Sequence, residues 1–161
     1  MRHRLRWVVS AACVTAALVA VIAVRFGPLL VPAPRVLAQA EPGCDVRAGP
    51  CTARFADGGD VTLEVDPRGI PVMQPLVLQV TIQGIEVSAV AVDFTGVDMN
   101  MGYNRPSLAP VGSGSWQGAG MLPTCVRARM LWEAKVLLTT PRGLFAAPFR
   151  FETDQSGRHG G

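Results

Sequence analysis

The protein is a chain of 161 residues with 49% hydrophobic residues and a formal net charge of +3. Five of its 15 basic residues stand in the first 40 positions without an acidic residue, whereas from Glu41 onward 10 basic and 12 acidic residues give a net charge of −2. The larger part of the chain lacks the basic stripe that nucleic-acid binding needs, so we expect no nucleic-acid partner.

The first 25 residues predict a membrane anchor. Three arginines precede an uncharged run from Trp7 to Val24, and Arg25 ends it. About 18 apolar residues are the lower limit for a helix that crosses a bilayer. Under the positive-inside rule the arginines keep the N-terminus in the cytoplasm. We therefore expect residues 1–25 to be an uncleaved anchor in the inner membrane, with the rest of the chain in the periplasm.

A second interpretation of the leader stays open. Ala38-Gln39-Ala40 has the small residues of a signal-peptidase site, but it begins 14 positions after Val24, which is far for a signal peptide. Cleavage after Ala40 would leave a periplasmic protein without an anchor. We favour the anchor, and in both cases the body of the chain is exported.

The remaining residues divide into three parts. Residues 26–43 contain four prolines and no clean period, which predicts an extended stalk. Residues 44–154 form a segment of about 110 residues, long enough for one packed core. The polar, glycine-rich residues 155–161 predict a disordered tail.

Strand patterns dominate residues 44–154. Val61 to Val65 alternates apolar and polar residues, and the turn residues of Asp57–Asp60 before it predict a hairpin with Thr52–Ala56. Further strands are predicted over Leu76–Gln83, Val87–Phe94, Trp116–Met121, Ala128–Thr139 and Leu144–Phe151. Roughly seven or eight short strands without a helical period predict an all-β fold, an antiparallel β-sandwich of immunoglobulin type.

Three cysteines lie beyond the leader, where an oxidising compartment favours disulfides. Cys44 and Cys51 are close in sequence and flank Gly49-Pro50, so a bridge between them is geometrically easy. We favour this pairing, which leaves Cys125 as a free thiol. A bridge from Cys125 to either of the other two, and the absence of any bridge, are the alternatives.

Sulfur atoms gather in the second half of the chain. Residues 99–130 hold four methionines and Cys125, and no histidine occurs between residues 4 and 158. Thioether and thiolate sulfurs are the soft ligands that select Cu(I). In an extended segment Met99 and Met101 would face one side. Their neighbours are typical of loops, where binding groups tend to lie.

Core packing is the competing interpretation of these residues, because methionine is an adaptable gap-filler. Met130 shares a predicted strand face with Trp132, which favours the core. Cys125 could be half of a disulfide or a small buried residue. Met121 is an optional fourth ligand, and Met73 belongs to no such set.

Catalysis has no support in the sequence. His3 and His159 are the only histidines and stand near the two ends, so a nucleophile in the domain has no imidazole base. Neither a zinc-ligand set nor a glycine-rich nucleotide motif is present. We therefore expect a protein that is not an enzyme.

Five short motifs follow one another between Val61 and Glu152. They are Asp93-Phe-Thr-Gly-Val-Asp-Met-Asn-Met-Gly102, Trp116-Gln-Gly-Ala-Gly120, Leu122-Pro-Thr-Cys125, Met130-Leu-Trp-Glu133 and Pro148-Phe-Arg-Phe151. With the N-terminal apolar segment, they make the chain similar to small periplasmic proteins of the FixH- and YtkA-like type. The resemblance implies an anchored immunoglobulin-like domain that acts in copper delivery and terminal-oxidase assembly, with Met99, Met101 and Cys125 in the copper-related role.

Two hypotheses follow for the function. The first is a membrane-anchored protein that binds Cu(I) weakly through Met99, Met101, Cys125 and optionally Met121, and hands it to a copper-acceptor or oxidase-assembly protein. The lack of a domain histidine argues against Cu(II). The second is a metal-free assembly module that uses the loop Met99–Asn104 as a protein-contact surface.

Overall fold

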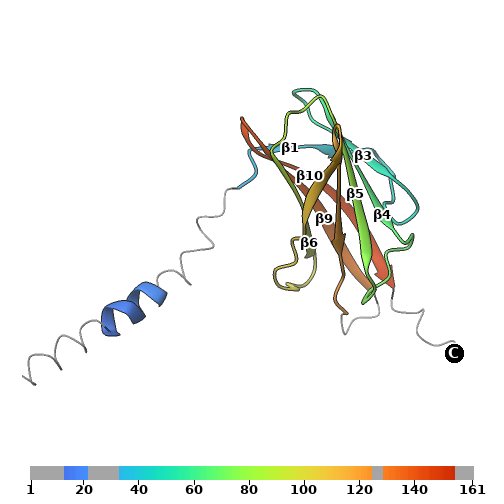
Figure 1. Cartoon of the computed structure of the whole chain (residues 1–161). Helices are drawn as coiled ribbons and strands as arrows, with labels where there is room; N and C mark the ends of the chain where they lie inside the picture. Colours follow the sequence, from blue (N-terminus) through green and yellow to red (C-terminus); the bar gives the residue numbers. More distant parts are fainter. Residues whose placement is uncertain (1–12, 22–32, 125–128, 155–161) are drawn as a thin grey trace, which may run out of the picture. The chain divides into compact units, whose positions relative to one another are not determined.

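The computed structural model describes residues 13–21, 33–124 and 129–154. The chain consists of two compact units, Met1–Ala33 and Pro34–Gly161. In the first unit residues 13–21 are helical (blue in Figure 1). No helix among the described residues has the length and apolar character needed to cross a membrane. The predicted span also includes residues 7–12 and 22–24, which lie outside the described residues, as does the predicted tail.

The second unit is built from β-strands, and the prediction of a β-rich fold is confirmed. Its described residues form β1 (Val36–Leu37), β2 (Gln39–Ala40), β3 (Cys51–Arg54), β4 (Asp60–Asp66), β5 (Leu76–Gln83), β6 (Ala89–Gly96), β7 (Ser107–Gly112), β8 (Ser115–Gly120), β9 (Arg129–Thr140) and β10 (Gly143–Asp154). The hydrogen-bonded order is β1-β10-β9-β6-β7-β8-β5-β4-β3-β2 (Figure 1).

Alternating side chains explain the strands that the sequence predicted. In β5 the apolar residues Leu76, Leu78, Val80 and Ile82 are buried and the residues between them are exposed. This two-residue period turns one strand face toward the core and the other toward water. The two longest strands, β9 and β10, form a hairpin. Arg129 pairs with Asp154 at its open end, and Thr140 pairs with Gly143 at the turn.

The strand order has two halves, β1-β10-β9-β6 and β8-β5-β4-β3-β2, with β7 between them. The hydrophobic core lies between these halves. Trp132 and Phe145 are fully buried, and the indole N–H of Trp132 donates to Thr153 Oγ1 at 3.0 Å, so this polar group is satisfied in the core. The ring of Phe55, just after β3, lies 5.4 Å from the ring of Phe145 in β10. β7 joins the halves, because its first residues pair with β6 and its later residues with β8.

The segment predicted as a stalk contributes two strands, which corrects the predicted domain boundary at residue 44. β1 runs parallel to β10 and β2 runs antiparallel to β3. Between them Ala38 is 4% exposed, and its N–H donates to the carbonyl oxygen of Ala146 at 2.8 Å. The prolines at positions 34 and 42 flank these strands, so they remove no hydrogen bond from them.

The disulfide between Cys44 and Cys51 confirms the favoured pairing. Their Cα atoms are 5.7 Å apart, within the ordinary range for a disulfide. The bridge ties the start of β3 to the turn that precedes it. Cys125 lies outside the described residues.

Candidate functional site

The loop after β6 carries the two central candidate ligands. Phe94 N–H donates to the carbonyl oxygen of Asn104 at 2.9 Å, and Val97 N–H donates to that of Leu131 at the same distance. At the tip, the side chain of Asn100 accepts a hydrogen bond from Gly102 N–H at 2.8 Å. Such an asparagine turn fixes the backbone locally. The loop is therefore held both by its neighbours and by its own contacts.

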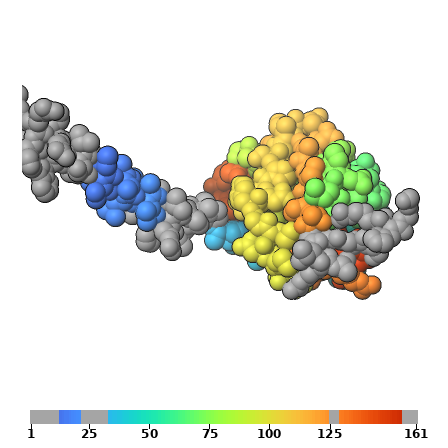
Figure 2. All heavy atoms as spheres, turned by 90° about the horizontal axis from the view of Figure 1, so that it is seen from below, coloured from blue at the N-terminus to red at the C-terminus, as the bar shows by residue number. Residues whose placement is uncertain are grey.

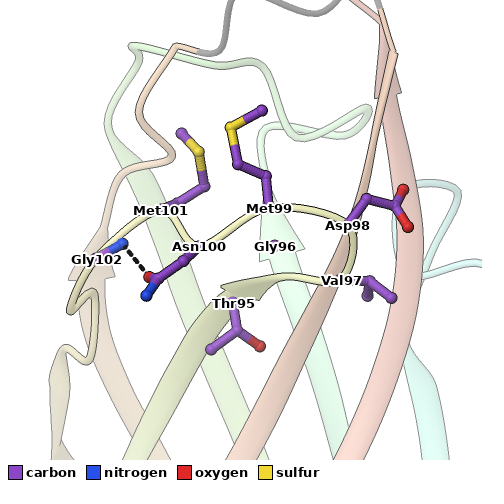
Figure 3. A pocket seen from close by; sticks show the side chains of 8 residues that line it. All are labelled: Thr95, Gly96, Val97, Asp98, Met99, Asn100, Met101 and Gly102. Carbon is purple, nitrogen blue, oxygen red and sulfur yellow. Dashed lines mark hydrogen bonds between the residues drawn. The ribbon is translucent and has the colours of Figure 1, made fainter.

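Met99 and Met101 extend from the same side of this loop, whereas Thr95 points the other way (Figure 3). Both methionines are half-buried and pack against the hydrophobic core. The residues from Thr95 to Gly102 line a hollow of ≈ 450 Å³. The shared orientation is what a common metal site requires. The contact with the core shows that packing also determines where these side chains lie.

Gly96 allows three methionines to approach one point of the backbone. A Cβ atom on Gly96 would collide with the methyl group of Met130 and the carbonyl oxygen of Met99, and would lie 3.2 Å from Cγ of Met101. Met130 comes from β9 and is buried, as its strand face predicted. Glycine is therefore required here for close approach rather than for a turn.

Met121 lies at the same end of the domain, directly after β8. Its carbonyl oxygen accepts a hydrogen bond from Asn104 Nδ2 at 2.9 Å, which connects it to the loop of Met99 and Met101. Its side chain is 44% exposed. The structure thus brings three predicted ligands to one end of the domain, while the fourth, Cys125, lies outside the described residues.

Met73, which the sequence placed in no ligand set, is a neighbour of the segment that contains Met121. It lies in the connection between β4 and β5, and its N–H donates to the carbonyl oxygen of Leu122 at 2.8 Å. The pairing of β5 with β8 explains this, because Leu76 at the start of β5 is opposite Gly120 at the end of β8. Figure 2 looks onto this end, where the segments near residues 70, 100 and 120 (green, yellow and orange) are neighbours.

A fixed cation lies beside the loop. Arg105 forms an ion pair with the buried Asp93, with 2.9 Å between Nη2 and Oδ2. This hydrogen bond with Asp93 raises the pKa of Arg105, although burial opposes the shift. The guanidinium carbon also lies 5.4 Å from the ring centre of Tyr103, a cation–π distance. Tyr103 itself is 82% exposed.

Methionine thioethers are the soft donors that this end of the domain presents. Among the described residues, no three His, Cys, Asp or Glu side chains form a group that could hold a metal ion. Comparison of the chain with protein-family models, with curated proteins and with solved structures finds no match.

Proposed function

We propose that the protein is a membrane-anchored periplasmic protein that binds Cu(I) and passes it on during oxidase assembly or copper homeostasis. The observation that carries this proposal is the common orientation of Met99 and Met101 over the hollow formed by their own loop (Figure 3). Two neutral thioethers on one side of a loop are a donor pair suited to Cu(I). The protein acts as a carrier rather than an enzyme.

The ligand set consists of Met99 and Met101, with Met121 and Cys125 as further donors. Because Cys44 and Cys51 are bonded to each other, neither of them competes for the thiol of Cys125. Met121 is tied to the ligand loop through Asn104. A thioether binds through one neutral sulfur and is readily replaced by another soft ligand, which favours transfer over storage.

The sheet order supports an immunoglobulin-like sandwich, and we propose that the uncleaved leader holds it at the membrane. Cleavage after Ala40 would separate β1 and β2 from the domain and remove the buried Ala38. The place of both strands in the domain therefore argues against a cut after Ala40. The apolar N-terminal run and the resemblance to FixH- and YtkA-like proteins favour the same arrangement.

A second function has its own observation. Tyr103 is 82% exposed and Val97 is 43% exposed, and both lie in the connection between β6 and β7. Exposed aromatic and apolar side chains on one loop favour a protein-contact surface. In this alternative the protein is a metal-free assembly module, and Met99–Asn104 contacts a partner protein.

Copper titration of the full chain distinguishes the two functions. The protein is kept in detergent, without oxygen, with ascorbate as reductant so that no added thiol competes for copper. A chromophoric Cu(I) chelator serves as the competitor. The wild type is expected to withdraw Cu(I) from the chelator, and Met99→Leu/Met101→Leu is expected to lose this ability.

A matched variant tests whether the position of the sulfurs matters or only their number. Adding Leu37→Met and Val111→Met to the double variant restores the methionine count at two exposed positions of other strands. The variant with all four substitutions should remain unable to withdraw Cu(I) from the chelator. If the wild type itself takes none, the copper function is wrong and the contact-surface alternative stands.

A further inference from the structure

Met73 shares an anchoring point with Met121. Its N–H donates to the carbonyl oxygen of Leu122, the residue that directly follows Met121. Leu122 is fully buried, whereas the side chains of Met73 and Met121 are 55% and 44% exposed. Two exposed thioethers therefore belong to backbone segments that are fixed to each other by a hydrogen bond and secured by a buried leucine.

The backbone of Met73 is strained. Its φ of 59° lies in the left-handed region, where residues other than glycine and asparagine are uncommon. Ile70 in the same connection has a φ of 51°. Its side chain is fully buried, so the free energy gained by burying it offsets the strain. Met73 is more than half exposed, so burial does not account for a methionine here. Strain at such a position points to a function of the side chain.

The strained connection belongs to the same end of the domain as the candidate copper ligands. Asn104 connects Met121 to the loop of Met99 and Met101, and Met73 is joined to the residue after Met121. Figure 2 shows the three segments side by side on the surface. The end thus carries a half-buried pair, Met99 and Met101, and an exposed pair, Met73 and Met121.

We propose that Met73 is a further Cu(I) ligand at the solvent-facing rim of this site, where it receives and releases the ion together with Met121. This inference rests on the proposed copper function. The transfer is a ligand substitution in which one sulfur–copper bond forms as another breaks. Copper stays Cu(I), and no proton is moved because a thioether carries none.

Exposure determines the order of contact. An incoming carrier or an acceptor protein reaches the exposed thioethers before the half-buried ones. Methionine has three rotatable bonds and a polarizable sulfur, so an exposed side chain can follow the ion over a range of positions. Met73 therefore adds a donor from the connection between β4 and β5 to the exposed donor Met121, which follows β8.

Two substitutions of Met73 test the proposal in the full chain, under the copper titration conditions described above. Met73→Leu keeps the size of the side chain and removes the sulfur. Met73→Gly also removes the sulfur but relieves the left-handed strain, so its unfolding temperature should equal or exceed that of the wild type. Both variants should bind Cu(I) at least about tenfold more weakly, because the loss of even a group that only supports a ligand has an effect of this size at a metal site.

Val111→Met is the control, because it adds an exposed thioether in β7 outside this end and should leave the affinity unchanged. Wild-type affinity in both Met73 variants would overturn the inference while leaving the copper function intact. A wild-type protein that binds no Cu(I) would overturn both. Since Met73→Gly is expected to fold at least as well as the wild type, reduced binding by it cannot be assigned to unfolding.

Discussion

Glu133 on β9 forms ion pairs with two basic side chains, and these pairs make the stability of the fold depend on pH. Its carboxylate lies 3.1 Å from Lys135 Nζ and 3.0 Å from Arg150 Nε. Burial by itself raises the pKa of Glu133, but the hydrogen bonds from Lys135 and Arg150 and the attraction of their charges together outweigh burial, so the net pKa lies below its usual value of 4.5. The ionised form is therefore more favoured in the folded chain than in the unfolded one.

This shift predicts a loss of stability in acid that depends on Glu133. A lowered folded-state pKa contributes stability that is complete above the unfolded value of 4.5 and disappears as the pH falls through the lowered value. Thermal unfolding from about pH 6 to about pH 3 should therefore show a smaller fall in unfolding temperature for Glu133→Gln than for the wild type. Glu86→Gln, which removes an exposed carboxylate, serves as the control. An unchanged pH profile in Glu133→Gln would contradict the role of this carboxylate.

Gly96 provides the second prediction at the level of one residue. Gly96→Ala places a methyl group against the carbonyl oxygen of Met99, which belongs to the backbone and cannot rotate away. We expect a loss of about 1–3 kcal/mol in the free energy of unfolding, as for other overpacked sites. Urea denaturation measures this loss. Gly112→Ala is the matched control, because the nearest atom to its new methyl group is 3.9 Å away, and it should leave stability nearly unchanged.

The strands fall into those that their own residues specify and those that depend on distant partners. β4, β5, β9 and β10 were predicted because apolar and polar residues alternate along them. β1 and β2 have two residues each, so no period can be read from them. β7 contains a proline and ends at a glycine, and it switches partners part-way along. Its sequence therefore carries no clear strand pattern.

The same distinction applies to the candidate site. Met99 and Met101 were identified together because they are two positions apart in one loop-like segment. The local bridge between Cys44 and Cys51 was likewise predictable from short spacing. Met73 is brought to this end only by the pairing of β5 with β8, a contact between segments about 40 residues apart that sequence spacing does not reveal.

The segment from β1 to β2 predicts a strong effect of one substitution. Ala38→Asp puts a carboxylate where the native side chain is 4% exposed, between two strands that pair in opposite halves of the sheet. We expect a loss of at least about 2 kcal/mol in the free energy of unfolding, because a buried charge without a partner is costly. Gln39→Asp introduces the same charge at an exposed neighbour and should cost far less. Equal losses in the two variants, measured by urea denaturation, would contradict this.

In the whole domain, one short segment supplies the first and the last strand of the order. β1 lies beside β10 and β2 beside β3, and these are the first and last pairs of the order. An uncovered edge strand offers free backbone groups to a neighbouring molecule. Residues 36–40 therefore cover part of two edges with a single stretch of chain, namely residues 145–146 of β10 and residues 53–54 of β3.

This protection predicts different behaviour for two shortened chains. A chain that begins at Pro34 keeps β1 and β2 and should be monomeric and cooperatively folded. A chain that begins at Glu41 lacks both strands and should self-associate and unfold at lower temperature. Size-exclusion chromatography and thermal unfolding compare them directly. Identical profiles would show that residues 34–40 are dispensable for the fold.

The exposure of Met73 and Met121 has a consequence for chemical damage. Peroxide reaches exposed thioethers more easily than half-buried ones, and it converts methionine to its sulfoxide, a polar group that methionine sulfoxide reductases restore. A sulfoxide is no longer a soft sulfur donor. On the proposed function, the outer pair would be the first part of the site to fail under oxidative stress and could be repaired while Met99 and Met101 remain intact.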